Sequence, residues 1–238
     1  MSVKDIKVVI LAGGKGTRFR PFSFVIPKPL MPIGADPILL YIINRFKKNN
    51  ISKFLISTGY QAELVRAYFG NGEKFGVSIK YFHEEKPLGT AGPLSLMKDE
   101  FVDDEYLFLM NGDIYTELNF ADMEKFAKKN NFDLVVGYVE KTEKSSFGVL
   151  DITKNKINKI IEKPETTFCF SSGIYILKGK AIQQIPDFEF YTMPDLINAY
   201  LACGKSVGAF QVKDFWIGIE NTENLEEVLK RTGMLEID

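Results

Sequence analysis

The sequence has too few cysteine and histidine residues for a zinc or disulfide scaffold. Its 238 residues include two cysteines, Cys169 and Cys203, and one histidine, His83. Three such residues cannot build a Cys/His zinc cluster, and two cysteines give no disulfide framework. We therefore expect a protein of the reducing cytoplasm, with both cysteines buried as small hydrophobic side chains.

The chain also lacks an excess of charge of either sign and any long apolar run. Lys and Arg number 30 against 31 Asp and Glu, so the formal net charge is −1. There is no general basic field to attract nucleic acid or an anionic membrane, and we expect neither as a partner. The apolar run at 8–11 is too short for a signal segment, and no later run approaches the roughly 18 residues of a membrane span.

The composition is typical of a globular protein, with 45% hydrophobic and 13% aromatic residues. Apolar periodicity in the first half predicts alternating strands and helices. The strands are expected at 7–11, 54–57, 78–83 and 106–110, and the helices at 38–47, 62–69 and 90–97. This alternation predicts an α/β fold in which a Rossmann-like mixed sheet is flanked by helices.

The second half has a denser set of strands, typical of an α+β arrangement. Strands are expected at 134–139, 148–152, 157–161, 173–177 and 207–212, and helices at 120–130, 193–202 and 223–231. The composition shifts near residue 140, which indicates two lobes of one domain that spans 1–238.

A glycine-rich loop follows the first strand and reads Leu11, Ala12, Gly13, Gly14, Lys15, Gly16, Thr17 and Arg18. Its three glycines let backbone amides approach an anion closely. Arg18 and Lys28 lie in the same proline-stiffened loop, and cations beside amide donors suit a triphosphate. The pattern is neither a Walker loop nor a dinucleotide fingerprint, because Phe19 occupies the place of the third glycine. A tight strand-to-loop turn without a ligand is the alternative.

Three further segments place polar groups at the ends of predicted strands. Pro87, Gly89 and Thr90 join a strand to a helix, where Thr90 could cap the helix. Asp113 follows the strand at 106–110, and a carboxylate there suits Mg²⁺. Glu162-Lys163-Pro164 presents an acceptor and a cation side by side. The structural alternatives are a capped turn, an Asx turn and a surface charge pair, respectively.

Together these motifs resemble the sugar-1-phosphate nucleotidyltransferases, whose pattern Gly-Gly-x-Gly-Thr-Arg followed by Pro-Lys-Pro is met at 13–18 and 27–29. The resemblance covers nearly the whole chain, and residues 87–94 are most similar to mannose-1-phosphate guanylyltransferases. It implies transfer of a nucleoside monophosphate from an NTP to a sugar 1-phosphate, with Mg²⁺ as cofactor. GTP and a hexose or heptose 1-phosphate are favoured. The oligomeric state stays open.

The resemblance also implies roles for individual residues. The catalytic group comprises Arg18, Lys28, Asp113 and Lys163, with Asp113 as the metal ligand. The nucleotide would bind in a half that spans about 1–113, at Leu11, Ala12, Gly13, Gly14, Gly16, Thr17, Arg18, Lys28, Pro87, Gly89 and Thr90. The sugar phosphate would bind mainly in a half that spans about 114–238, at Gly112, Gly148, Glu162, Lys163, Ser171 and Gly173.

The chain departs from the family pattern at two places. Ser171 replaces an asparagine that often holds the sugar, and Gly218 replaces the aspartate that is the second metal ligand. Glu220 or Asp214 is the candidate substitute, and Glu220 could instead cap the final helix. Three alternatives stay open. One is a uridylyl-, thymidylyl- or cytidylyltransferase of the same family, and another is a catalytically weak regulatory relative, which Gly218 favours. The third is an NAD-binding oxidoreductase, which shares the strand–helix pattern but predicts a glycine at Phe19. The C-terminal β-helix of longer relatives is not expected.

Overall fold

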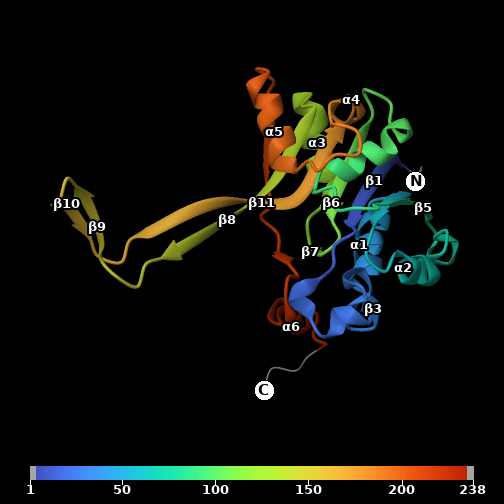
Figure 1. The fold of residues 1–238 in the computed structure, drawn as a ribbon, viewed down its shortest axis with the longest axis horizontal. Helices are drawn as coiled ribbons and strands as arrows, with labels where there is room; N and C mark the ends of the chain where they lie inside the picture. Colours follow the sequence, from blue (N-terminus) through green and yellow to red (C-terminus); the bar gives the residue numbers. More distant parts are fainter. Residues whose placement is uncertain (1–3, 235–238) are drawn as a thin grey trace.

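A seven-stranded sheet forms the centre of the molecule, a computed structural model that describes residues 4–234. The strand order is β12-β8-β11-β6-β1-β4-β5 (Figure 1). The strands are β1 Lys4–Ala12, β4 Ile51–Thr58, β5 Ser78–His83, β6 Tyr106–Asn111, β8 Leu134–Lys144, β11 Glu165–Lys178 and β12 Gly208–Gln211. β1 runs parallel to β4 and β6, and β11 runs antiparallel to both of its neighbours. The predicted mixed sheet is confirmed.

Helices cover both faces of this sheet. Successive strand residues point to opposite sides, so apolar side chains on both faces have to be buried. Val8 and Ile10 of β1 belong to one hydrophobic cluster, and Val9 belongs to the other. The first cluster packs under α1 Ile38–Lys47, α2 Ala62–Phe69, α3 Phe120–Asn130 and α6 Thr222–Arg231. The second packs under the 3₁₀ helix η5 Gly92–Glu100, α4 Gly179–Ile182 and α5 Met193–Ala202. No helix of the described residues is long and apolar enough to cross a membrane.

Short elements complete the connections between the sheet strands. The proline-rich loop after β1 contains three single 3₁₀ turns, η1 Thr17–Phe19, η2 Phe22–Phe24 and η3 Lys28–Leu30. It ends in the small strands β2 Pro32–Ile33 and β3 Asp36–Pro37, and η4 Glu73–Phe75 precedes β5. Near the cleft described below, β7 Ile114–Thr116 pairs with β13 Trp216–Gly218.

A two-stranded ribbon leaves the body of the molecule and ends in a hairpin (Figure 1). β8 and β11 form the ribbon, and β9 Val149–Thr153 with β10 Lys156–Ile161 forms the hairpin. We call residues 140–171 the arm; none of them is buried. Cys169 lies on the arm and is exposed, as is Cys203, so the expectation that both cysteines are buried is wrong.

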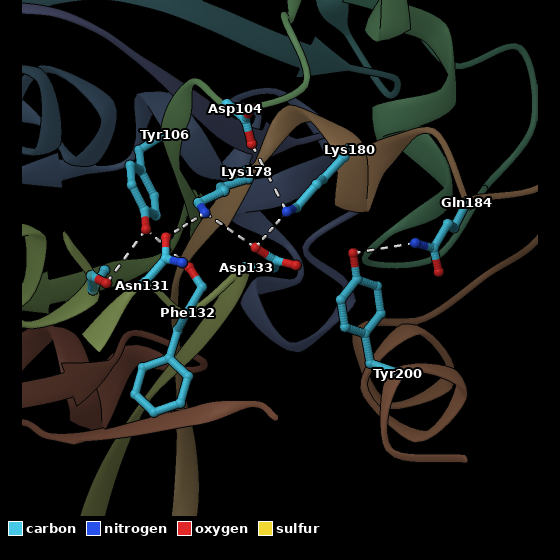
Figure 2. Close-up of polar contacts among 10 residues, drawn as sticks. Asp104, Tyr106, Asn131, Phe132, Asp133, Lys178, Lys180, Gln184 and Tyr200 are labelled. Carbon is cyan, nitrogen blue, oxygen red and sulfur yellow. Dashed lines mark hydrogen bonds and ion pairs between the residues drawn. The ribbon is translucent and has the colours of Figure 1, made fainter. Parts of the chain in front are cut away.

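Charged groups tie the strand ends together at the edge of the sheet where β6 begins (Figure 2). Lys180 and Lys178 contact Asp133 Oδ1 at 2.9 and 3.2 Å, and Lys178 also donates to Asn131 Oδ1. Burial alone would raise the pKa of Asp133, but hydrogen bonds from the two lysines outweigh it and hold the pKa below its usual value of 3.8. The cluster therefore stabilises the junction of β8, β11 and α4.

We expect Asp133→Asn to lower the free energy of unfolding by about 1–2 kcal/mol at pH 7, as typical for a lost charged hydrogen bond. The folded-state pKa lies below the unfolded value, so this contribution is present above pH 3.8 and is lost as the pH falls through the folded pKa. Urea unfolding of both proteins at several pH values measures the difference. Asp104→Asn is the control, because this carboxylate is 86% exposed and 3.8 Å from Lys180. Equal effects of the two substitutions would contradict the assignment.

Candidate active site

A cleft of about 790 Å³ opens at the carboxyl ends of β1, β4, β5 and β6. Open α/β sheets bind ligands at this edge. Every residue that the sequence assigned to the nucleotide lines the cleft, together with Gly112, Asp113 and Glu220. Four cations, Lys15, Arg18, Lys28 and Lys86, also line it. The carboxylates of Glu84, Glu85, Asp113 and Glu220 line it as well. The backbone amides and the cations suit a phosphorylated ligand, and the carboxylates suit its counter-ion.

The glycine loop owes its shape to three different constraints. A Cβ on Gly13 would lie 2.5 Å from Glu84 Oε1, so a side chain at position 13 would displace Glu84. Gly16 has φ +59°, a left-handed conformation that glycine adopts without strain. Phe19 is buried in the core, and it anchors the loop where a dinucleotide-binding protein would have a glycine.

Lys28 and Asp113 form an ion pair inside the cleft. Lys28 Nζ donates to Asp113 Oδ2 at 2.5 Å, and the two side chains are 16% and 32% exposed. Lys28 comes from η3, whereas Asp113 lies in the turn between β6 and β7. Each side chain is therefore only partly covered by protein. The second carboxylate oxygen of Asp113 and the other N–H groups of Lys28 can still bind a ligand.

A second ion pair lies at the exposed mouth of the cleft. Arg18 Nη1 donates to Glu220 Oε2, and both side chains are more than half exposed. Glu220 does not cap the final helix, because the side chain of Asn221 caps α6 by accepting from Asn224 N. The carboxylate of Glu220 is thus placed on the cleft, as a partner for Arg18.

Gly218 lies beside the candidate metal ligand. It pairs with Ile114 across β13 and β7, and the next amide, Ile219 N, donates to Asp113 O at 2.7 Å. A Cβ on Gly218 would meet no described atom closer than 3.9 Å, so the site has room for a side chain. The other candidate carboxylate, Asp214, precedes β13 at its far end and does not line the cleft.

The segment after β5 is held by its own chain. Glu84 accepts from Ser57 Oγ at 2.6 Å and from Leu88 N at 3.2 Å. A Cβ on Gly89 would lie 2.6 Å from Tyr191 O, so the close approach that this glycine permits is to the 189–191 segment. Thr90 Oγ1 accepts from Met193 N at the start of α5, rather than capping η5.

The residues assigned to the sugar phosphate are divided between the cleft and the arm. Gly112 lines the cleft, whereas Gly148, Glu162 and Lys163 lie on the arm. A Cβ on Gly148 would lie 3.1 Å from Glu162 Oε2, so these two meet each other there. Lys163 has φ +44°, an uncommon conformation for a residue with a side chain.

Ser171 and Gly173 lie at the root of the arm. A Cβ on Gly173 would meet Asn111 Nδ2 at 2.6 Å, and Asn111 lines the cleft. The hydroxyls of Ser171 and Tyr175 are hydrogen-bonded at 2.8 Å. Burial raises the pKa of Tyr175, and the hydrogen bond with Ser171 lowers it by a smaller amount. The net pKa is raised, so this tyrosine stays neutral at physiological pH.

The family model described as Nucleotidyl transferase matches residues 7–233. The chain belongs to the nucleotidyl transferase family. A mannose-1-phosphate guanyltransferase of Yarrowia lipolytica is 31% identical over 224 residues, which cover 90% of this chain and 60% of that protein. The chain thus spans about 60% of the length of this curated relative.

Solved structures share the fold over almost the whole chain. HddC from Yersinia pseudotuberculosis has a TM-score of 0.74 and 26% identity, covers 95% of this chain and is itself covered to 99%. That protein has also been solved in complex with GMP-PN. A Bacillus anthracis protein described as a glucose-1-phosphate thymidylyltransferase has a TM-score of 0.78 at 24% identity, with 98% of this chain and 97% of that chain covered.

Several residues of this nucleotidyl transferase cleft were not singled out from the sequence. Tyr60 and Gly59 follow β4, and the rule that ligands bind beyond parallel strand ends could have found them. Lys15 was visible within the glycine loop. Phe190 had no local signal, because contacts between 88–92 and 189–191 bring it to the cleft.

Proposed function

We propose that the protein transfers a nucleoside monophosphate from an NTP to a sugar 1-phosphate, giving an NDP-sugar and pyrophosphate. The observation that carries this proposal is the cleft in which a glycine loop, Lys28 and Asp113 converge. Family membership supports it, as do relatives whose names specify guanylyl and thymidylyl transfer to sugar phosphates. An NAD-binding oxidoreductase is disfavoured by the burial of Phe19.

The residues of the cleft suit a direct displacement at phosphorus. An oxygen of the sugar phosphate attacks the α-phosphorus in line, the bond to the β-phosphate oxygen breaks, and pyrophosphate leaves with the electron pair. The nucleophile is already an anion, so no general base is needed, and catalysis consists of positioning and charge neutralisation. Arg18 and Lys28 neutralise the leaving pyrophosphate, while Lys163, which lies on the arm and not in this cleft, would hold the sugar phosphate when an arm reaches the site.

Asp113 is a suitable ligand for Mg²⁺, which needs one or two protein carboxylates and completes its octahedron with water and phosphate oxygens. The described residues contain no cluster of three or more His, Cys, Asp or Glu side chains that could hold a metal, so substrate phosphates would have to supply most ligands. A bound ion would neutralise negative charge on the phosphates. With Asp113 holding an ion, Lys28 would be available to contact the phosphates.

We expect Gly218→Asp to lower the half-saturating Mg²⁺ concentration by a few-fold to about tenfold, because a second carboxylate strengthens the site. The backbone at Gly218 is not left-handed, and a Cβ there would be at ordinary contact distance. Mg²⁺ titration of pyrophosphate release measures the effect. Glu220→Gln tests the alternative ligand: an unchanged Mg²⁺ requirement leaves Glu220 as a partner of Arg18. An unaltered Mg²⁺ dependence in Gly218→Asp would contradict the placement of the metal at Asp113.

We propose GTP as the preferred nucleotide, with a hexose or heptose 1-phosphate as acceptor. The sequence of residues 87–94 supports this preference, as do the guanyltransferase relative and the GMP-PN complex of HddC. Pyrophosphate release over a matrix of four NTPs and several sugar 1-phosphates tests it, and GTP is expected to give the highest kcat/KM. A pyrimidine nucleotide that wins tenfold would reject the preference. Turnover of no pair would favour a regulatory relative.

We propose the cytoplasm as the place of this reaction. The two exposed, unpaired cysteines, Cys169 and Cys203, fit a reducing compartment.

A further inference from the structure

The arm exposes an unusual amount of apolar surface. Phe147 is 79% exposed and Ile157 is 64% exposed, although large aliphatic and aromatic side chains are normally covered. Further exposed apolar residues follow along the same segment: Val149, Leu150, Ile152, Ile160, Ile161, Phe168 and Phe170. So many exposed apolar side chains on one segment indicate an interaction site.

The ribbon that carries this surface is continuous, and no other element of residues 4–234 covers it. β8 and β11 are paired without a register shift from Glu165↔Lys144 to Ser171↔Tyr138, and the only shift lies between Ser171 and Tyr175. β12 pairs with β8 only as far as Tyr138, so the outer part of β8 has no partner strand on that side. Two-stranded ribbons are marginally stable in water unless another element packs on them.

The ribbon also points away from the cleft of its own chain. Residues 139–144 extend about 20 Å at the usual strand rise, and the hairpin adds to this reach. The root of the arm lies near the rim of the cleft, where Gly173 is close to Asn111. From there the ribbon projects out of the body of the molecule (Figure 1). Glu162 and Lys163 do not line the cleft of their own chain.

A matching apolar surface lies next to the cleft. Phe22, Phe24, Val25 and Ile26 are all exposed, and they belong to the loop that carries Arg18 and Lys28. Gln61 Nε2 donates to Phe24 O, which holds this patch beside the end of β4. An arm from another copy could therefore cover this patch while its residues Glu162 and Lys163, at the junction of hairpin and ribbon, reach the cleft.

We propose that two copies of this chain exchange arms, so that each cleft is completed by Glu162 and Lys163 of the other copy. Domain exchange is a common route to symmetric dimers, in which both copies use the same surfaces. The exchange covers the apolar arm and brings a cation for the second anionic substrate to a cleft that lacks its own Lys163. The catalytic part of this inference rests on the proposed function, whereas the dimer does not.

Active-site complementation tests the exchange. Chains with Arg18→Ala and with Lys163→Ala are co-expressed with two different tags, and the heterodimer is isolated by tandem affinity purification. With exchanged arms, one of its two sites combines an intact cleft with an intact arm, so kcat/KM for the sugar phosphate is expected at about half the wild-type value. With arms folded back in each chain, both sites are damaged and the activity stays at the level of the single variants.

The reciprocal heterodimer pairs a wild-type chain with a chain that carries both substitutions. Exchange predicts almost no activity, because each site then has one damaged component, whereas arms that stay in their own chain leave one intact site. An inactive first heterodimer together with an active second one overturns the exchange while leaving the transferase activity in place. Wild-type protein that releases no pyrophosphate from any substrate pair overturns the proposed function instead.

Mass in solution tests the dimer independently of activity. Light scattering during gel filtration is expected to give twice the chain mass for the wild type and a shift to monomer for the double variant Ile157→Asp, Ile160→Asp. Leu201→Asp is the matched control, since Leu201 on α5 is also exposed but lies outside the arm, and it should stay dimeric. A monomeric wild type, or a double variant that remains fully dimeric, would overturn the arm exchange.

Discussion

An Arg18→Ala variant is expected to turn over about 100- to 1,000-fold more slowly than the wild type, as typical when one preorganised contact to developing charge is lost. Arg18 lines the cleft beside the glycine loop and is exposed, so its side chain contributes little to the folded state. The loss should therefore fall on kcat, with thermal unfolding unchanged. Pyrophosphate release at saturating substrates and a thermal melt measure the two quantities.

Arg20→Ala is the matched control for Arg18→Ala. Arg20 belongs to the same loop, lies over the Phe24 ring at 5.1 Å and does not line the cleft. We expect its kcat to stay within a few-fold of the wild type. Near-normal turnover in Arg18→Ala, or equal losses of kcat in both variants, would contradict the role assigned to Arg18 in neutralising the leaving pyrophosphate.

Replacing Asp113 with asparagine is expected to have an effect of similar size on kcat, about 100- to 1,000-fold, because the charge that organises the reacting phosphates is lost. The substitution keeps the shape of the side chain but removes the negative charge that faces Lys28. Nucleotide binding without Mg²⁺ should be retained, since the glycine loop is untouched. Calorimetric nucleotide titration and pyrophosphate release across a range of Mg²⁺ concentrations separate the two effects.

Asp214→Asn serves as the control for Asp113→Asn, because Asp214 is exposed and lies outside the cleft. It should leave both kcat and the Mg²⁺ dependence unchanged. A fully active Asp113→Asn protein at ordinary Mg²⁺ concentrations would place the metal elsewhere in the cleft.

Apolar periodicity within a segment predicted those helices whose formation depends mainly on the residues of that segment. The helices at 62–69, 120–130 and 193–202 have the expected bounds because their apolar periodicity is unbroken. The predicted helix at 90–97 is instead a 3₁₀ helix at 92–100. Gly92 and Pro93 are poor helix formers, and Ser95 Oγ donates to Gly92 O and accepts from Phe188 N, so local bonds compete with the α-helical pattern.

In the candidate site, too, residues in local motifs could be predicted, whereas contacts between distant segments could not. The glycine loop, Lys28 and Asp113 could be predicted because short motifs at strand ends meet at one edge of the sheet. The contact of Gly89 with Tyr191 and the outward course of the arm depend on pairing between segments far apart in the sequence. No local spacing encodes either of them, so the placement of Glu162 and Lys163 could not be predicted.

The contact between Gly13 and Glu84 has a consequence for substitutions at position 13. Glu84 also binds Ser57 and Leu88, so it supports the segment after β5 while it occupies the space beside Gly13. A side chain at position 13 would require the carboxylate of Glu84 to move, which disturbs its hydrogen bonds with Ser57 Oγ and Leu88 N. A substitution at position 13 therefore disturbs the segment after β5 as well as the glycine loop.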